Sequence, residues 1–174
     1  MQRISIVGSA GSGKSTLGAT LAVRLPCPLV ELDTLYWGPG WQAAPVDVFR
    51  AEVAAALASE RWVVCGNYGN VRDLVWGRAD TVIWLDYPLP LIFTRLYRRT
   101  WQRIVTQEEL WGGNRESWRA QFLSRESLFW YVLRTHRRRQ REFAAMLADP
   151  KYAHLAVLHL RRPAEAALLL SQLS

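Results

Sequence analysis

The sequence predicts a three-layer α/β fold in which helices cover both faces of a parallel sheet. Short apolar runs rich in β-branched residues recur along the chain, and stretches with helical periodicity separate them. The apolar runs are near-continuous instead of alternating, which is typical of strands buried on both faces. A glycine-rich turn joins the first run to the first helical stretch. Because half of the 174 residues are apolar, residues 1–174 can form one domain with its own core.

The expected elements alternate along the chain. The strands are residues 3–7 (RISIV), 28–32 (PLVEL), 62–65 (WVVC), 81–85 (TVIWL) and 155–160 (LAVLHL). The helices are residues 14–25, 46–59, 89–105, about 117–147, and 164–173. Only residues 106–115 (TQEELWGGNR) show no clear pattern, and the pair Gly112-Gly113 lies at their centre. We therefore expect a lid around residues 100–135.

The net charge of +7 is concentrated in one segment. Between Arg95 and Arg141 there are twelve arginines and four glutamates, which indicates an anionic partner: the phosphates of a small ligand or a nucleic-acid backbone. The two cysteines, without a secretory pattern, predict a cytoplasmic protein with free thiols. Every apolar run is far shorter than the ~20 residues that cross a bilayer, so we expect no membrane partner.

Residues 8–16 (GSAGSGKST) match the pattern G-x-x-x-x-G-K-[ST] between a strand and a helix, the context that this phosphate-binding loop requires. Its glycines let backbone N–H groups surround phosphate oxygens, and the helix start adds a positive dipole end. Lys14 is expected to reach the β- and γ-phosphates, and the Ser15 hydroxyl to ligate Mg²⁺. The predicted nucleotide-binding residues are Gly8, Ser9, Ala10, Gly11, Ser12, Gly13, Lys14, Ser15 and Thr16. ATP and Mg²⁺ are the expected cofactors.

Four further stretches extend this motif into a family pattern: ELDTLYWGPGW at residues 31–41, CGNYGN at 65–70, WLDYP at 84–88, and the arginine-rich stretch that follows. With the phosphate-binding loop, they make the chain resemble the small P-loop kinases of the nucleoside-monophosphate-kinase-like group. More closely, it resembles the DNA-topology-modulation (FlaR-like) proteins, which are adenylate-kinase relatives. The resemblance covers nearly the whole chain. It implies a P-loop NTPase fold with a five-stranded parallel sheet in the order 2-3-1-4-5 and ligand sites at the carboxyl ends of the strands.

The acceptor side of such a kinase falls on residues after the second and third strands. The Asp33 carboxylate can act as base or orient Mg²⁺ through water, and the resemblance implies that it holds the phosphate acceptor. The alternative is that it caps the turn or a short helix beginning at Thr34. Trp37 and Trp41 flank a Gly-Pro-Gly turn and can either clamp a flat acceptor or pack the loop against the next helix. The remaining predicted acceptor residues are Gly66, Asn67, Tyr68 and Arg72, with a plain turn as the alternative.

The donor side falls on the arginine-rich helix. Arg95 and Arg99 share one helical face, and the resemblance implies that they flank the nucleotide, one against the base and one on phosphates. A solvated basic face is the alternative. The resemblance also places Arg161 and Pro163, after the last strand, along the adenine, and gives Asp86 mainly a turn-forming role. A second basic set is equally open between a lid, a polyanion patch and a solvated surface: Arg134, Arg137, Arg138 and Arg141.

Cys65 departs from the family pattern. The resembled kinases commonly carry aspartate there, where it helps to hold the water shell of Mg²⁺, which a protonated thiol cannot do. We therefore expect Cys65→Asp to raise Mg²⁺-dependent turnover.

Together these features predict an ATP-dependent small-molecule phosphotransferase, nucleotide- or nucleoside-kinase-like, with Lys14, Asp33 and Arg99 as its catalytic residues. Its partners are ATP and a small phosphate acceptor. The alternative is a nucleotide-binding regulatory protein that binds DNA through the arginine-rich surface. The oligomeric state is open between a monomer and a homodimer.

Overall fold

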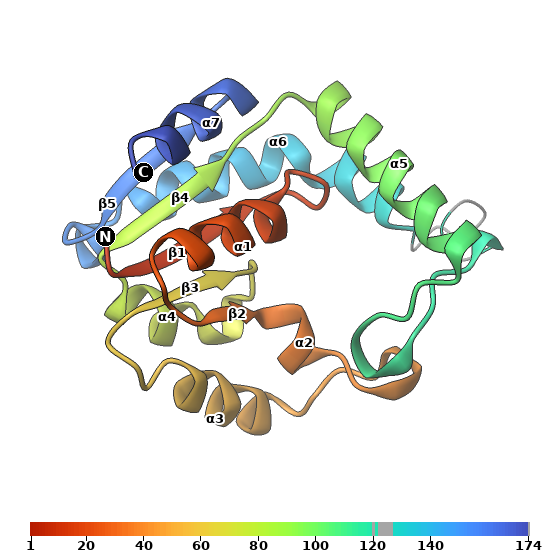
Figure 1. Ribbon diagram of the computed structural model, residues 1–174, viewed down its shortest axis with the longest axis horizontal. Coiled ribbons are helices and arrows are strands. Elements are labelled where there is room, and N and C mark those ends of the chain that lie inside the picture. The colour runs from red at the N-terminus through yellow and green to blue at the C-terminus, as the bar shows by residue number, and fades with distance from the viewer. Residues whose placement is uncertain (120, 122–126, 174) are drawn as a thin grey trace.

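The five predicted strands form one parallel sheet. The computed structural model describes residues 1–119, 121 and 127–173. The strands are β1 (Arg3–Gly8), β2 (Leu29–Glu31), β3 (Trp62–Cys65), β4 (Thr81–Leu85) and β5 (Ala156–Leu160). They lie in the order 2-3-1-4-5, and every neighbouring pair is parallel (Figure 1). The predicted fold class and strand order are therefore confirmed.

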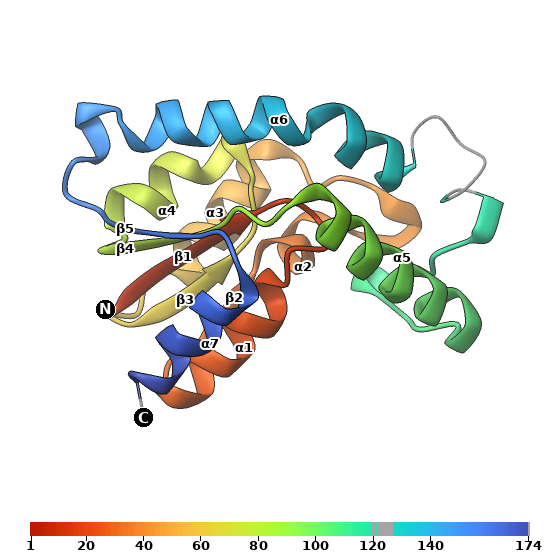
Figure 2. The same cartoon turned by 90° about the horizontal axis from the view of Figure 1, so that it is seen from above.

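Helices cover both faces of this sheet. They are α1 (Lys14–Arg24), α2 (Leu32–Tyr36), α3 (Val46–Ala56), α4 (Arg72–Arg78), α5 (Leu89–Thr106), α6 (Leu128–Leu147) and α7 (Pro163–Ser171). Short 3₁₀ turns are η1 (Pro39–Trp41), η2 (Gly69–Val71), η3 (Trp111–Gly113) and η5 (Pro150–Tyr152). Figure 2 shows α3, α4 and α6 on one face of the sheet and α1 and α7 on the other. Among the described residues, no helix is both long enough and apolar enough to cross a membrane.

Side chains of each central strand enter both layers alternately. In β1, Ile4 and Ile6 are fully buried in a core that includes Leu21 of α1. Val7 lies in the opposite core, together with Phe49 of α3. Because successive side chains point to opposite faces, a strand between two helical layers favours apolar residues at nearly every position, and the buried Ser5 of β1 accepts a hydrogen bond from Trp76. This explains the near-continuous apolar runs in the sequence.

Two predicted boundaries are wrong. The chain enters α2 at Leu32, so β2 is shorter than the predicted strand at residues 28–32. The predicted helix over residues 117–147 is interrupted: residues 118, 119 and 121 are helical, but Ser127 is not. Helix α6 begins at Leu128, where the Ser127 side chain caps it by accepting a hydrogen bond from the Trp130 N–H at 3.3 Å. The parts of this helix and of the predicted lid at residues 120 and 122–126 lie outside the described residues. Helices α2 and α4 were not among the predicted helices.

Candidate active site

The glycine-rich loop lies at the carboxyl end of β1, packed tightly against its neighbours. Gly8 and Gly11 have φ angles of 149° and 81°, which favour glycine. A Cβ on Gly8 would lie 2.6 Å from the Leu85 carbonyl oxygen, and one on Gly11 would lie 2.8 Å from the Ile92 carbonyl oxygen. The loop therefore runs against the end of β4 and the first turn of α5, and no larger side chain fits at either position.

Lys14 turns back onto this loop. Its Nζ donates hydrogen bonds to the carbonyl oxygens of Gly8 at 2.9 Å and Ser9 at 3.1 Å. Burial lowers the pKa of Lys14 to about 8, although the nearby charge of Asp33 acts in the opposite direction. The ammonium group thus lies at the mouth of the loop with part of its hydrogen-bonding capacity still available.

Glu31 is a site residue that the sequence did not assign. The Ser15 hydroxyl donates a hydrogen bond to Glu31 Oε2 at 3.0 Å. Burial raises the pKa of Glu31, the sign of a carboxylate that lacks a full counter-charge. A hydroxyl next to a carboxylate is an oxygen donor set that suits Mg²⁺, which keeps most of its waters and needs few protein ligands. The sequence signal that could have found Glu31 is its position as an acidic residue at the carboxyl end of a predicted strand.

Asp33 and Tyr68 meet across the same edge of the sheet. Asp33 lies in the first turn of α2 and accepts a hydrogen bond from the Tyr68 hydroxyl. The cap position of that helix belongs to Glu31, so Asp33 does not cap it. Burial and the charge of Asp33 raise the pKa of Tyr68, which keeps its hydroxyl protonated as a donor. Asp33 also lies near enough to Lys14 and Arg99 to influence both electrostatically.

The tryptophans after α2 pack against the predicted lid. Trp37 and Trp41 contact each other edge to face at 5.9 Å, and Trp41 contacts Trp111 in the same way at 6.3 Å. The buried Asn114 side chain joins the two segments: its Oδ1 accepts from the Trp41 N–H at 3.0 Å, and its Nδ2 donates to the Gly38 carbonyl at 2.8 Å. Figure 1 shows the segment after α5 lying against the segment after α2. The ring of Trp41 contacts those of Trp37 and Trp111 edge to face, and these rings do not lie on opposite sides of a flat binding slot.

A cavity of about 320 Å³ opens beside the loop. Its lining residues are Ser15, Glu31, Arg103, Glu108, Glu109, Leu110 and Trp111. This volume is within the range of small-ligand sites. Arg103 contacts Glu116 at 3.2 Å and Glu108 at 3.7 Å, so its charge is already balanced within the wall. The cavity therefore runs from Ser15 and Glu31 to the underside of residues 106–115.

Arginines from two helices approach the loop. Arg95 of α5 donates to the Ser12 carbonyl at 3.1 Å and lies 5.4 Å from the Tyr87 ring. Arg99 is desolvated by burial, which lowers its pKa, and its Nε has no hydrogen-bond partner among the described residues. Arg139 of α6, which the sequence did not assign, lies close enough to lower the pKa of Lys14.

The other α6 arginines make different contacts. Arg134 lies 5.5 Å from the ring of Trp130, and Arg138 pairs with Glu142 at 3.3 Å. On α5, Arg95 and Arg103 make their contacts inside the site. The α5 arginines thus contact the site, whereas Arg134, Arg137, Arg138 and Arg141 of α6 are all exposed.

The remaining predicted acceptor residues surround a much smaller space. Gly66, Asn67, Tyr68 and Arg72 line a cavity of about 20 Å³, which is room for a water molecule and not for an acceptor. The Asn67 amide is bonded to both backbone groups of Gly8. Arg72 lies 5.6 Å from the Trp76 ring. Within this set of described residues, only Tyr68 hydrogen-bonds Asp33 directly.

Cys65 faces α1 and not the cavity. Its Sγ donates to the Lys14 carbonyl at 3.3 Å, and a Cβ on Gly18 would lie 2.4 Å from this sulfur. Burial raises the pKa of the Cys65 thiol to about 12, so it stays protonated at neutral pH. The acidic group beside Ser15 is Glu31, from the neighbouring strand.

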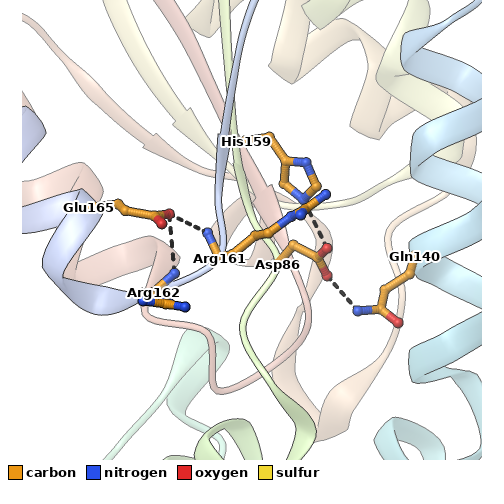
Figure 3. A network of polar contacts seen from close by, with 6 residues as sticks. All are labelled: Asp86, Gln140, His159, Arg161, Arg162 and Glu165. Carbon is orange, nitrogen blue, oxygen red and sulfur yellow. Dashed lines mark hydrogen bonds and ion pairs between the residues drawn. The ribbon is translucent and has the colours of Figure 1, made fainter.

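Asp86 joins β4, β5 and α6. It accepts from Gln140 Nε2 at 2.8 Å and contacts His159 Nε2 at 2.8 Å (Figure 3). The His159 ring also stacks on Trp84 with a centroid distance of 4.0 Å. Both carboxylate oxygens of Asp86 are therefore engaged away from the phosphate-binding loop.

The predicted adenine edge lies beside this network. Glu165 accepts from the backbone N–H groups of Arg161 at 2.6 Å and Arg162 at 3.2 Å, as Figure 3 shows. Pro163 starts α7 at its first position, where a missing N–H group costs nothing. The backbone N–H groups of Arg161 and Arg162 are thus bonded to the side chain of a residue in α7.

The chain is similar to one uncharacterized protein over most of its length. It is 31% identical over 130 residues to the uncharacterized protein YqaC of Bacillus subtilis (strain 168), and the match covers 74% of this chain and 72% of YqaC. It is also 31% identical over 106 residues to shikimate kinase of Synechococcus elongatus, over 52% of this chain and 55% of that enzyme. The chain therefore spans about half the length of that kinase. No protein-family model matches the sequence.

Solved structures of small-molecule kinases share the fold. Shikimate kinase from Bacteroides thetaiotaomicron superposes with a TM-score of 0.54 and 17% identity, covering 99% of this chain and 96% of that one. A gluconokinase from Sinorhizobium meliloti 1021 gives a TM-score of 0.51 and 20% identity, covering 99% and 93%. The fold is that of the P-loop kinases, and the chain belongs to the family of the uncharacterized protein YqaC.

Proposed function

We propose that this protein is an ATP-dependent phosphotransferase that acts on a small hydroxylated acceptor. The observation that carries the proposal is that Asp33 lies close enough to Lys14 to influence its pKa, while the next residue, Ser15, lines the cavity of about 320 Å³. The fold is shared with small-molecule kinases. Lys14 binds the transferred phosphoryl group, and Arg95, Arg99 and the backbone of the loop hold the rest of the triphosphate.

Ser15 and Glu31 hold Mg²⁺ in this proposal. When bound, the ion neutralises charge on the phosphate oxygens. Glu31 accepts a hydrogen bond from the Ser15 hydroxyl, and if Ser15 bound the ion, the Glu31 carboxylate would be available to hold waters of the ion. This assignment replaces the carboxylate that the family pattern led us to expect at Cys65.

Asp33 is the base. The acceptor hydroxyl passes its proton to the Asp33 carboxylate while its oxygen forms a bond to the γ-phosphorus, the bond to the bridging oxygen breaks, and ADP leaves. Arg99 balances charge on the transferred group. Residues 106–115, fastened by Asn114 to the segment after α2, form the lid that excludes water.

The wall of the cavity favours a neutral or cationic acceptor. Three carboxylates line it: Glu108 pairs with Arg103 and Glu109 with Arg115, whereas no ion pair is seen for Glu31 among the described residues. An acceptor carboxylate would meet like charges there without a free cation among the described lining residues. We therefore expect shikimate, the acid named for the similar enzymes, to be a poor substrate.

We also propose that the protein is related to the FlaR-like topology-modulation proteins. We further propose that it is located in the cytoplasm. DNA binding is the weaker alternative, because the α5 arginines contact the site itself. Its signature would be a steep dependence of duplex affinity on salt.

The decisive experiment is a phosphotransfer assay with ATP and Mg²⁺ over a panel of polyols, amino alcohols, nucleosides and hydroxy acids. Transfer to a hydroxyl compound, abolished or reduced about 10²–10³-fold by Lys14→Ala, supports the proposal. ATP binding without transfer to any member of the panel contradicts it.

A further inference from the structure

We propose that Asn67 is a positioning residue that fixes the first peptide of the phosphate-binding loop and lets Lys14 leave it when a nucleotide binds. The inference rests on the proposed binding of ATP to this loop. It assigns to Asn67 a role toward the donor, whereas the sequence predicted a role toward the acceptor.

The Asn67 side chain hydrogen-bonds the backbone of Gly8 through both the oxygen and the nitrogen of its amide. Its Oδ1 accepts from the Gly8 N–H at 3.1 Å, and its Nδ2 donates to the Gly8 carbonyl. The two residues are 59 positions apart in the chain. An amide is the side-chain group that offers an acceptor and a donor side by side, as this pairing requires.

The turn after β3 presents Asn67 in this position. The Gly66 N–H donates to the Ile6 carbonyl at 3.3 Å, which extends the pairing of β3 with β1 by one residue. The chain then turns at Gly66, whose φ is 148° and whose Cβ would lie 2.8 Å from Leu32. Asn67 therefore leaves the sheet directly beside the end of β1.

The Gly8 carbonyl has a second partner in Lys14. Lys14 Nζ donates to this oxygen at 2.9 Å and to the Ser9 carbonyl at 3.1 Å, so the ammonium group is held by its own loop. To contact a phosphate, Lys14 exchanges these contacts for phosphate oxygens. Asn67 Nδ2 remains on the Gly8 carbonyl after that exchange, so the oxygen does not become an unpaired buried acceptor.

Aspartate in place of Asn67 has the opposite effect. The substituted carboxylate would keep an acceptor for the Gly8 N–H but turn a second oxygen toward the Gly8 carbonyl, and its charge would hold the Lys14 ammonium in the retracted position. Asn67→Ala removes the two hydrogen bonds to Gly8 without adding a charge. The proposal therefore predicts an order of nucleotide affinity: wild type, then Asn67→Ala, then Asn67→Asp.

The test measures the dissociation constant of a nonhydrolysable ATP analogue with Mg²⁺ by calorimetry on the full chain. We expect Asn67→Ala to raise it about tenfold and Asn67→Asp about a hundredfold. Asn70→Asp is the matched control, since Asn70 is an exposed residue of the same loop. Thermal unfolding of each ligand-free variant measures any purely structural effect, which lowers the melting temperature without producing this order of affinities.

Wild-type affinity in both Asn67 variants, or a raised KM for the acceptor with an unchanged KM for ATP, would overturn the role of Asn67 alone. A wild-type protein that does not bind the analogue would overturn nucleotide binding itself, and this inference with it.

Discussion

The hydroxyl of Tyr68 donates a hydrogen bond to the carboxylate of Asp33 and so joins the loop after β3 to the first turn of α2. One oxygen of Asp33 is thereby fixed, and the carboxylate is held in one orientation. In the proposed reaction, this leaves the other oxygen for the acceptor hydroxyl. The ring of Tyr68 is held in turn by Tyr36, with centroids 4.5 Å apart, and by Phe49 at 5.2 Å.

Tyr68→Phe should therefore lower kcat/KM for the acceptor about tenfold and leave the affinity for an ATP analogue unchanged. The lost bond to a charged group is worth about 1.5–3 kcal/mol, part of which water restores. Steady-state kinetics and calorimetry make the comparison. Tyr36→Phe is the control because it removes a neighbouring hydroxyl and keeps the bond between Tyr68 and Asp33. An equal loss in both variants would contradict a specific role for that bond.

Glu31→Gln should raise the Mg²⁺ concentration required for half-maximal activity about 10–100-fold, the usual effect of losing an oriented carboxylate at a metal site. The reason is its position 3.0 Å from the Ser15 hydroxyl. Titration of activity with Mg²⁺ at saturating ATP measures it. Glu109→Gln is the control. Glu109 lines the same cavity but pairs with Arg115 at 2.6 Å, so the Mg²⁺ requirement of this variant should stay at the wild-type value.

Affinity for the ATP analogue should fall as the pH rises above about 8, the pKa to which burial lowers Lys14. Bound phosphates favour the charged ammonium, so above this pH binding must take up a proton, and the affinity should fall about tenfold per pH unit. Below pH 7 the affinity should be flat with respect to this group. Calorimetry in buffers of different ionisation enthalpy measures the number of protons taken up on binding. Lys14→Arg stays charged and should remove the pH dependence of the affinity.

Asn114→Ala should detach the predicted lid from the segment after α2. It removes the partners of the Trp41 N–H and the Gly38 carbonyl, which should cost about 1–3 kcal/mol of local stability and raise KM for the acceptor. Hydrogen exchange at the Trp41 amide reports the opening. Asn114→Asp keeps the acceptor for this N–H but loses the bonds that Nδ2 donates to the Gly38 and Trp111 carbonyls, so its Trp41 amide should stay better protected than in the alanine variant.

For Cys65→Asp, the structure reverses the expectation drawn from the sequence. The thiol is 3% exposed and lies against the Lys14 carbonyl, so an added carboxylate would be buried beside Glu31 and Asp33, whose charges already raise the pKa of Cys65. We expect a loss of roughly 3 kcal/mol in the free energy of unfolding and no gain in turnover. Denaturant unfolding measures the loss, with Cys65→Ser as the uncharged control, and a faster aspartate enzyme would restore the earlier interpretation.

Local pattern alone determined the framework of this protein. The apolar runs predicted the five strands, of which β1, β3 and β4 are buried at nearly every position, as strands covered on both faces require, whereas β5 is partly exposed. The spacing of residues 8–16 located the loop between β1 and α1. These signals lie within a few residues of each other, so the sequence carries them without reference to the rest of the chain.

Only the tertiary structure decided which side chains meet. Asn67 reaches Gly8 across 59 residues, and Asn114 reaches Trp41 across 73. Glu31 lies beside Ser15 because β2 ends near the start of α1, and Arg139 approaches Lys14 because of the rotational position of α6. Periodicity shows that a helix has faces, but the packing of the helix on the sheet determines which face turns toward the site.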